Sequence, residues 1–241
     1  MSAARRVLDA ARRRFPAAYE RARRMAALPR GAAAWYAHRL RSGPGEAEEA
    51  YGSEFWDFHD TGDWDGFARV VLRHAPARAV VDVGCGDGKL LAAVARAAPG
   101  TRVLGVDSSP TALRVARGRG VETRPLDLAA VSRRQVGEIV RELGAFDLAV
   151  SLETVEHFPP WHSGKLLRLV TVAPVVVFSA AQPGQGGTLH VNERPVEHWV
   201  RRFRRLGYAL SAENEAFRAG VRALDLPPWY RANVNLFVRQ G

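Results

Sequence analysis

The segment that most constrains the fold of this chain is a glycine-rich turn at residues 80–88, which reads VVDVGCGDG. The turn joins a short run of β-branched residues to a segment with helical spacing at residues 89–97. Glycines at a strand-to-helix turn let the backbone approach a ligand closely and place that ligand at the start of the helix. The segment therefore predicts an α/β fold with a ligand at this turn.

Short β-branched runs alternate with helical segments along most of the chain after residue 64. This alternation indicates an α/β, doubly wound, Rossmann-like fold, whose seven-stranded, mostly parallel sheet carries helices on both faces. The predicted strands are residues 79–83, 102–107, 121–124, 146–151, 174–179, 208–213 and 233–239, and the predicted helices are residues 64–74, 89–97, 111–117, 133–143, 163–171 and 195–206.

Basic residues are concentrated at the start of the chain. The 241 residues carry a formal net charge of +10, and residues 1–41 account for +9 of it, with 11 of the 35 basic residues and two acids. Their alanine- and arginine-rich pattern predicts a helical extension over residues 1–45, followed by one α/β domain over residues 46–241. We interpret the extension as a cap that packs on the domain or on a second copy of the chain in a homodimer. A basic arm for RNA or for a membrane surface is the alternative.

Several classes of protein are excluded by what the sequence lacks. A single cysteine, Cys85, excludes a disulfide scaffold within the chain. No uninterrupted apolar stretch approaches the roughly 20 residues that span a bilayer, and the arginine-rich start lacks the apolar core of a secretory signal. We therefore expect a cytoplasmic protein without a membrane span. An aromatic group precedes the α/β pattern and forms either a lid over the site or part of an ordinary core; its members are Tyr51, Phe55, Trp56, Phe58 and Trp64.

The glycine spacing separates two classes of nucleotide ligand. Dinucleotide-binding proteins use G-x-G-x-x-G to hold a pyrophosphate, whereas this chain has G-x-G-x-G with Asp82 inside the preceding strand. An acid at that place suits a ligand with an ammonium end and no phosphate. Asp107 ends the next strand, where an acidic side chain accepts hydrogen bonds from ribose hydroxyls. S-adenosylmethionine has these properties, because it joins an amino acid and a sulfonium to adenosine.

On these residues, the stretch from 51 to 239 resembles the class I S-adenosylmethionine-dependent methyltransferases. The resemblance extends to residues 126–128 (LDL), where the family's acidic residue meets the adenine amino group, and to residues 146–150 (FDLAV), the family's fourth strand. It implies S-adenosylmethionine as the cofactor. The cofactor-binding residues that it implies are Asp82, Gly84, Gly86, Gly88, Asp107, Ser108, Asp127 and Leu128.

A second polar segment, residues 151–160, follows the predicted fourth strand and reads SLETVEHFPP. Ligands of this fold lie outside the carboxyl ends of the strands, so we expect this segment near the transferred methyl group. Glu153 and Glu156, with His157 beside the second acid, can face one way from a helical turn. Such a set suits Mg²⁺ or another divalent metal, a general base for a substrate hydroxyl, or support of the cofactor pocket.

A later histidine, His190, lies in the loop at residues 180–195. Small-RNA 2′-O-methyltransferases and ubiquinone-pathway O-methyltransferases, which this pattern resembles, pair a later histidine with the earlier segment to bind magnesium. That resemblance implies Glu153, Glu156, His157 and His190 as metal ligands. Without a metal, His157 or His190 is the expected catalytic base, with Glu153 beside them. The glycines of the loop favour substrate binding, and Asn192 as a helix cap is the alternative.

The loop and two further segments, residues 195–199 and 227–234, are similar to a bacterial group of class I methyltransferases found with glycan or secondary-metabolite genes. The resemblance implies O-methylation of a small hydroxylated molecule or a sugar. An RNA ribose 2′-O-methyltransferase that uses the basic extension is one alternative, and a non-catalytic cofactor-binding partner subunit is another. The nearly neutral charge of residues 42–241 argues against a nucleic-acid partner.

Overall fold

The computed structural model describes residues 62–187 and 190–241. The expected helical extension over residues 1–45 lies outside these described ranges, as do the aromatic residues expected at positions 51–58. Two residues of the predicted substrate loop, Thr188 and Leu189, also lie outside them. The expectations for these segments stay predictions.

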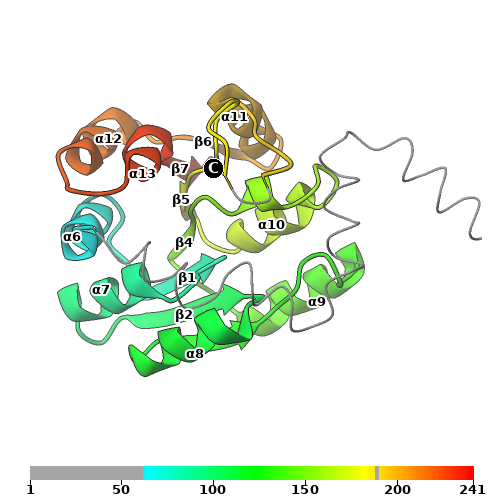
Figure 1. Ribbon diagram of the computed structural model, residues 1–241, viewed down its shortest axis with the longest axis horizontal. Coiled ribbons are helices and arrows are strands. Elements are labelled where there is room, and N and C mark those ends of the chain that lie inside the picture. Colours follow the sequence, from blue (N-terminus) through cyan, green and yellow to red (C-terminus); the bar gives the residue numbers. More distant parts are fainter. Residues whose placement is uncertain (1–61, 188–189) are drawn as a thin grey trace, which may run out of the picture. The chain divides into compact units, whose positions relative to one another are not determined.

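A seven-stranded sheet forms the centre of the described structure, in the order β3-β2-β1-β4-β5-β7-β6 (Figure 1). Strands β1 to β5 run parallel to one another, and β7 pairs antiparallel with both β5 and β6. This topology confirms the predicted fold. The strands are β1 (Ala79–Val83), β2 (Arg102–Asp107), β3 (Glu122–Pro125), β4 (Leu148–Ser151), β5 (Val175–Phe178), β6 (Tyr208–Leu210) and β7 (Asn235–Arg239).

Helices cover both faces of the sheet because successive strand side chains point to opposite faces and both faces are apolar. In β1, for example, Val80 belongs to the core on one face and Val81 to the core on the other. The first face is covered by α6 (Trp64–His74), α7 (Lys89–Ala97), α8 (Pro110–Gly118) and α12 (Asn214–Arg222), and the second by α9 (Arg133–Leu143), α10 (Ser163–Val170) and α11 (Val196–Arg204). Among the described residues, no helix combines the length and apolarity needed to cross a lipid bilayer.

The last third of the chain differs from the sequence prediction. The strand expected over residues 208–213 ends at Leu210, and α12 follows it, where no helix was predicted. A second unpredicted helix, α13 (Pro228–Asn233), precedes β7, which begins at Asn235 rather than at residue 233. Long-range hydrogen bonds fix both helices, since Asn214 accepts from the backbone N–H of Leu236 and Arg218 donates to the carbonyl groups of Ala232 and Val234.

The order of the strands determines where a ligand can bind. Winding starts at β1 and moves outward to β2 and β3, and the chain then returns to β4 on the other side of β1. The connections after β1 and β4 therefore leave on opposite faces of the sheet, which opens a crevice at their carboxyl ends. The glycine turn, the end of β2 and the segments after β4 and β5 all meet at this edge.

Candidate cofactor and acceptor site

The glycine turn after β1 has a backbone that only glycine adopts easily. Gly84, Gly86 and Gly88 have φ angles of +85°, +53° and +74°, in the left-handed region. A Cβ atom on Gly84 would lie 2.3 Å from the side chain of Thr154, and one on Gly88 would lie 2.8 Å from the Cβ of Ala116. The turn is therefore packed too tightly for any side chain at these two positions.

Asp107, at the end of β2, ties the glycine turn to the start of α8. One carboxylate oxygen accepts a hydrogen bond from the backbone N–H of Gly86 at 2.9 Å, and the other accepts from that of Ser109 at 2.8 Å. Burial raises the pKa of Asp107, and the N–H groups of Ser109, Gly86 and Ser108 offset part of that rise. The acid expected to bind the ribose is thus held rigidly beside the glycine turn, with the exposed Ser108 next to it.

Asp82, inside β1, is a buried acid that forms no ion pair with any residue of the described ranges. Its side chain is 5% exposed, and its Oδ1 atom has no hydrogen-bond partner among the described residues. Burial, followed by the charge of Asp107, raises the pKa of Asp82 from 3.8 to about 7. A buried carboxylate oxygen without a hydrogen-bond partner is costly, and a cationic ligand group beside it would remove that cost. The ammonium group of S-adenosylmethionine fits this requirement.

We expect the affinity for S-adenosylmethionine to depend on pH through Asp82. A cationic group binds the ionised carboxylate, so below pH 7 binding must first release a proton from the free protein. The affinity should therefore fall about tenfold per pH unit from pH 7 to 5.5. Calorimetry in buffers of different ionisation enthalpy measures this proton release. The Asp82→Asn variant should bind S-adenosylmethionine weakly, with an affinity that does not change with pH. A wild-type affinity that is independent of pH would contradict the assignment of Asp82 as the partner of the ammonium group.

The same carboxyl sets a pH dependence of stability in the free protein. The folded pKa of about 7 lies above the ordinary value of 3.8, so the folded state binds more protons than the unfolded state between these values. The free energy of unfolding contributed by Asp82 is consequently highest below pH 3.8 and is lost as the pH rises towards 7.

The segment expected to meet the adenine follows β3. Asp127 accepts a hydrogen bond from the backbone N–H of Ala129 at 2.9 Å, and Leu128 is buried. The ammonium group of Lys165, a buried residue of α10, donates to the carbonyl groups of Leu128 and Val131. Lys165 therefore holds the segment that contains Leu128 and Val131 against α10, a role that the sequence analysis did not assign.

Three of the four residues predicted to bind a metal come together after β4 and β5. One ligand atom each from Glu156, His157 and His190 lies within 4.8 Å of the others, and the two imidazole rings meet edge to face. Glu156 is fully buried, and neither of its carboxylate oxygens has a hydrogen-bond partner in the described part of the chain. Burial, followed by the charge of Glu153, raises its pKa well above the usual value. A divalent cation fits this donor set because it would neutralise the buried acid.

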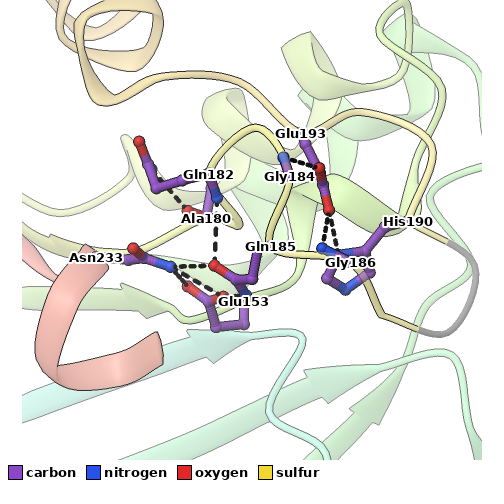
Figure 2. A network of polar contacts seen from close by, with 9 residues as sticks. All are labelled: Glu153, Ala180, Gln182, Gly184, Gln185, Gly186, His190, Glu193 and Asn233. Atoms are coloured by element: carbon purple, nitrogen blue, oxygen red, sulfur yellow. Dashed lines mark hydrogen bonds and ion pairs between the residues drawn. The ribbon is translucent and has the colours of Figure 1, made fainter. Parts of the chain in front are cut away.

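Glu153, the fourth predicted ligand, lies outside this group. Its φ angle of +46° places it in the left-handed region just before the 3₁₀ turn η1 (Val155–His157). Glu153 and Glu156 therefore do not share the helical turn that the sequence analysis expected. The Glu153 carboxylate instead accepts hydrogen bonds from the side-chain amides of Gln185, at 2.8 Å, and Asn233, at 3.2 and 3.3 Å (Figure 2).

The loop after β5 is held in shape by two sets of polar contacts, which Figure 2 shows on either side of residues 182–187. In the first, Gln185 bridges Glu153 and Asn233. In the second, the Glu193 carboxylate accepts from the backbone N–H groups of Gly184 and Gly186 and contacts Nδ1 of His190 at 3.2 Å. Burial raises the pKa of Glu193, but these partners outweigh burial and leave it below its usual value. Glu193 thereby orients His190.

Asn192 does not cap α11, which corrects one alternative from the sequence. Its side chain is buried and donates hydrogen bonds to the hydroxyl of Ser163 at 2.9 Å and to the carbonyl of Val155 at 3.3 Å. The first N–H of α11, that of Val196, donates instead to the side-chain oxygen of Gln182. Asn192 therefore joins the loop to α10 and η1.

Two residues of α13 complete the site and were not predicted. Asn233 is 5% exposed and donates to both Glu153 and Gln185. Burial raises the pKa of the Tyr230 hydroxyl, and the charges of Glu153, Asp82 and Glu156 raise it further. The ring of Tyr230 packs edge to face on that of Trp64. Residues 227–234 are similar to a bacterial group of class I methyltransferases, but no local sequence pattern identifies the amide of Asn233 or the phenol of Tyr230 as part of a site.

Asn233→Ala should release the loop while leaving the cofactor pocket intact. The change removes the donor shared by Glu153 and Gln185, so backbone amides of residues 182–187 should exchange hydrogen about tenfold faster. The affinity for S-adenosylmethionine should change by no more than about twofold. Gln185→Ala and the double variant provide the control, because residues acting in one network give non-additive effects. A loss of cofactor affinity of about tenfold in Asn233→Ala would show that Asn233 supports the cofactor pocket instead.

The fold and the site define a Rossmann-like protein with a nucleoside-cofactor site at the carboxyl edge of its sheet, and comparison with known proteins specifies its class. Residues 81–170 match the family model described as a methyltransferase domain. The ubiquinone biosynthesis O-methyltransferase of Methylobacterium sp. (strain 4-46) is 39% identical over 104 residues, which cover 42% of this chain and 39% of that protein. The trans-aconitate 2-methyltransferase of Mycobacterium tuberculosis (strain ATCC 25177 / H37Ra) is 32% identical over 165 residues, which cover 68% and 56%.

Among solved structures, the sugar N-methyltransferase KedS8 from Streptoalloteichus sp. ATCC 53650 superposes with a TM-score of 0.56 at 15% identity, over 79% of this chain and 93% of that one. This likeness shows the fold. The chain spans less than two thirds of the length of each of the two curated relatives. With the family match, these findings place the chain among the class I S-adenosylmethionine-dependent methyltransferases, whose cofactor is S-adenosylmethionine.

Proposed function

We propose that the chain transfers the methyl group of S-adenosylmethionine to a hydroxyl oxygen of a small hydroxylated molecule or a sugar. One observation carries this proposal: Glu156 lies with His157 and His190 at the edge of the sheet where the cofactor's methyl group is expected, and its buried carboxylate oxygens have no hydrogen-bond partner among the described residues. Two imidazoles beside a buried acid suit the removal of a proton from a hydroxyl group. The ubiquinone biosynthesis relative, an O-methyltransferase by name, supports the same chemistry.

The chain's own residues have three tasks in this reaction. Bound S-adenosylmethionine supplies a methyl group that its sulfonium has already activated. Asp82, Asp107 and the glycine turn hold the cofactor, and the loop at residues 182–187 excludes water and orients the acceptor. The acceptor hydroxyl must lose its proton as the new bond forms. His190 takes that proton on Nε2, since its Nδ1 atom faces Glu193, whose carboxylate stabilises the resulting imidazolium.

A divalent metal is compatible with the same residues. Glu156, His157 and His190 would hold it, and it would lower the pKa of an acceptor hydroxyl bound next to them. Two imidazoles and one carboxylate favour a transition metal such as Mn²⁺, Fe²⁺ or Zn²⁺ over Mg²⁺, which prefers oxygen ligands. Glu153 would not be a direct ligand in the arrangement described above, because its carboxylate is bound by Gln185 and Asn233.

A screen of acceptors for release of S-adenosylhomocysteine tests this function. Polyphenols, hydroxy acids, sugars and their amino counterparts are each offered with purified chain, with and without a chelator. O-methylation of at least one hydroxylated acceptor is the expected result. Loss of activity with chelator and recovery with Mn²⁺ supports the metal-assisted form, and unchanged activity supports His190 as the base. Transfer to amines alone would overturn the proposed oxygen acceptor.

RNA ribose is a second candidate acceptor, and one observation favours it: residues 1–41 carry 11 of the 35 basic residues. An RNA enzyme should bind RNA with an affinity that falls steeply with salt and that is lost when residues 1–41 are deleted. Retention of tight binding after the deletion would count against this candidate. A non-catalytic role as a partner subunit is excluded if the purified chain transfers methyl groups by itself.

A further inference from the structure

A basic cavity of about 400 Å³ lies between α10 and α11, apart from the cofactor and acceptor site. Helix α10 contributes Gly164 and Leu167 to its lining, and the cationic side of the cavity comes from α11 and the residue just after it. The cationic lining residues are His198, Arg201, Arg202 and Arg205. None of the residues predicted to bind the cofactor, the acceptor or a metal belongs to this lining.

The spacing of these four residues explains why they converge. Positions 198, 201, 202 and 205 fall on one face of a helix, while Trp199 and Phe203 on the opposite face are buried in the core. A Cβ atom on Gly164 would lie 3.4 Å from a terminal nitrogen of Arg202. The absence of a side chain at Gly164 thus lets the guanidinium of Arg202 lie close to α10 across the cavity.

The positive charges of the cavity are not neutralised within the described part of the chain. Arg201, Arg202 and Arg205 form no ion pair or side-chain hydrogen bond there, whereas Arg96, Arg119 and Arg124 each contact a carboxylate. Glu197, the acid in the first turn of α11, makes no ion pair with them either. Like charges held this close repel one another, so the free cavity favours an anion.

Burial and the repulsion between these positive charges lower the pKa values of two groups that line the cavity. Burial lowers the pKa of His198, and the charges of Arg194, Arg202, Arg201 and Arg205 lower it further. Burial also lowers the pKa of Arg202, followed by the charges of Arg205 and Arg133. An anion in the cavity would reverse the electrostatic part of both effects.

We propose that this basic cavity binds a phosphate or diphosphate group of a small organic ligand. Guanidinium groups match the geometry of phosphate oxygens and donate paired hydrogen bonds to them. The volume suits a small ligand, and Leu167 provides an apolar surface for the part of the ligand beyond its phosphate. A nucleic-acid backbone is a poorer fit, because the cations converge on one concavity rather than follow a line of successive phosphates. The proposal is independent of the proposed methyl acceptor.

Calorimetry with the full chain and sodium diphosphate tests this proposal at constant ionic strength. We expect one diphosphate per chain and a loss of affinity of about tenfold or more when Arg202→Gln and Arg205→Gln are combined. Arg204→Gln is the matched control, because Arg204 lies on the same helix, is exposed and does not line the cavity. It should change the affinity by no more than about twofold.

Two further measurements separate specific binding from general charge attraction. Diphosphate should raise the pKa of His198, followed by histidine NMR, in wild type and in Arg204→Gln but not in the double variant. The double variant should also melt no lower than wild type without diphosphate, because it loses repulsion between like charges. Equal loss of affinity in Arg204→Gln would overturn the proposal. Tight, arginine-dependent binding of RNA or of anionic vesicles with no binding of diphosphate would also overturn it.

Discussion

Asp107→Ala should weaken the binding of S-adenosylmethionine by about 100-fold or more, because hydrogen bonds to a charged group each contribute about 1.5–3 kcal/mol. The carboxylate is expected to accept hydrogen bonds from the ribose hydroxyls. It also accepts from the backbone N–H groups of Gly86 and Ser109, so its removal loosens the turn that cradles the cofactor. Calorimetric titration of wild type and variant measures the difference directly.

The control for this variant is Asp147→Ala. Asp147 precedes β4 at the opposite edge of the sheet, and its carboxylate also accepts from two backbone N–H groups, those of Arg78 and Ala79. Its loss should lower the melting temperature without changing the affinity for S-adenosylmethionine. Equal weakening in the two variants would show that Asp107 acts through general stability, and the ribose-binding assignment would then be wrong.

His190→Ala should lower turnover by about 100-fold or more while leaving the affinity for S-adenosylmethionine unchanged, as expected for the loss of a general base. The imidazole is oriented by Glu193 and lies against His157 beside the buried Glu156. Gly187 makes room for it, since a Cβ atom there would lie 2.5 Å from Nε2 of His190. Single-turnover rates with an acceptor found in the screen measure the effect.

His74→Ala is the matched control for this second variant. His74 of α6 also contacts a carboxylate through Nδ1, that of Glu213 at 2.7 Å, but it lies outside the predicted site. The variant should retain turnover even if its melting temperature falls. Near-normal turnover of His190→Ala, with acceptor binding intact, would remove His190 from the mechanism.

Much of the fold could be predicted because its determinants are local. The structure places α6, α7, β2 and α9 at the predicted residues, where the apolar spacing is reinforced by caps such as Asp63 and the capping box of Ser132 and Gln135. Helices α12 and α13 could not be predicted in the same way. Their positions depend on long-range contacts, such as the hydrogen bond between Asn214 and Leu236, which are 22 positions apart. Such contacts produce no periodic pattern in the sequence.

The same difference between local patterns and long-range contacts decides which parts of the site could be predicted. The glycine turn and Asp107 could be proposed from the sequence because the fold spaces them along adjoining elements, and the structure joins them through the hydrogen bond from Gly86 to Asp107. The position of Glu153 was not, since residue type does not reveal that its backbone is left-handed and that Gln185 and Asn233 bind its carboxylate. Its partner Asn233 lies 80 residues further along the chain, and only the folded structure brings the two together.

Binding of S-adenosylmethionine to the purified chain, compared with Asp82→Asn and Asp107→Ala, tests the central claim most directly. Calorimetry requires no acceptor, so an unidentified substrate cannot obscure the result. We predict one S-adenosylmethionine per folded chain, with proton release below pH 7, and severe loss of affinity in both variants. A folded chain that does not bind S-adenosylmethionine, or that binds it equally well without either carboxylate, would contradict the account.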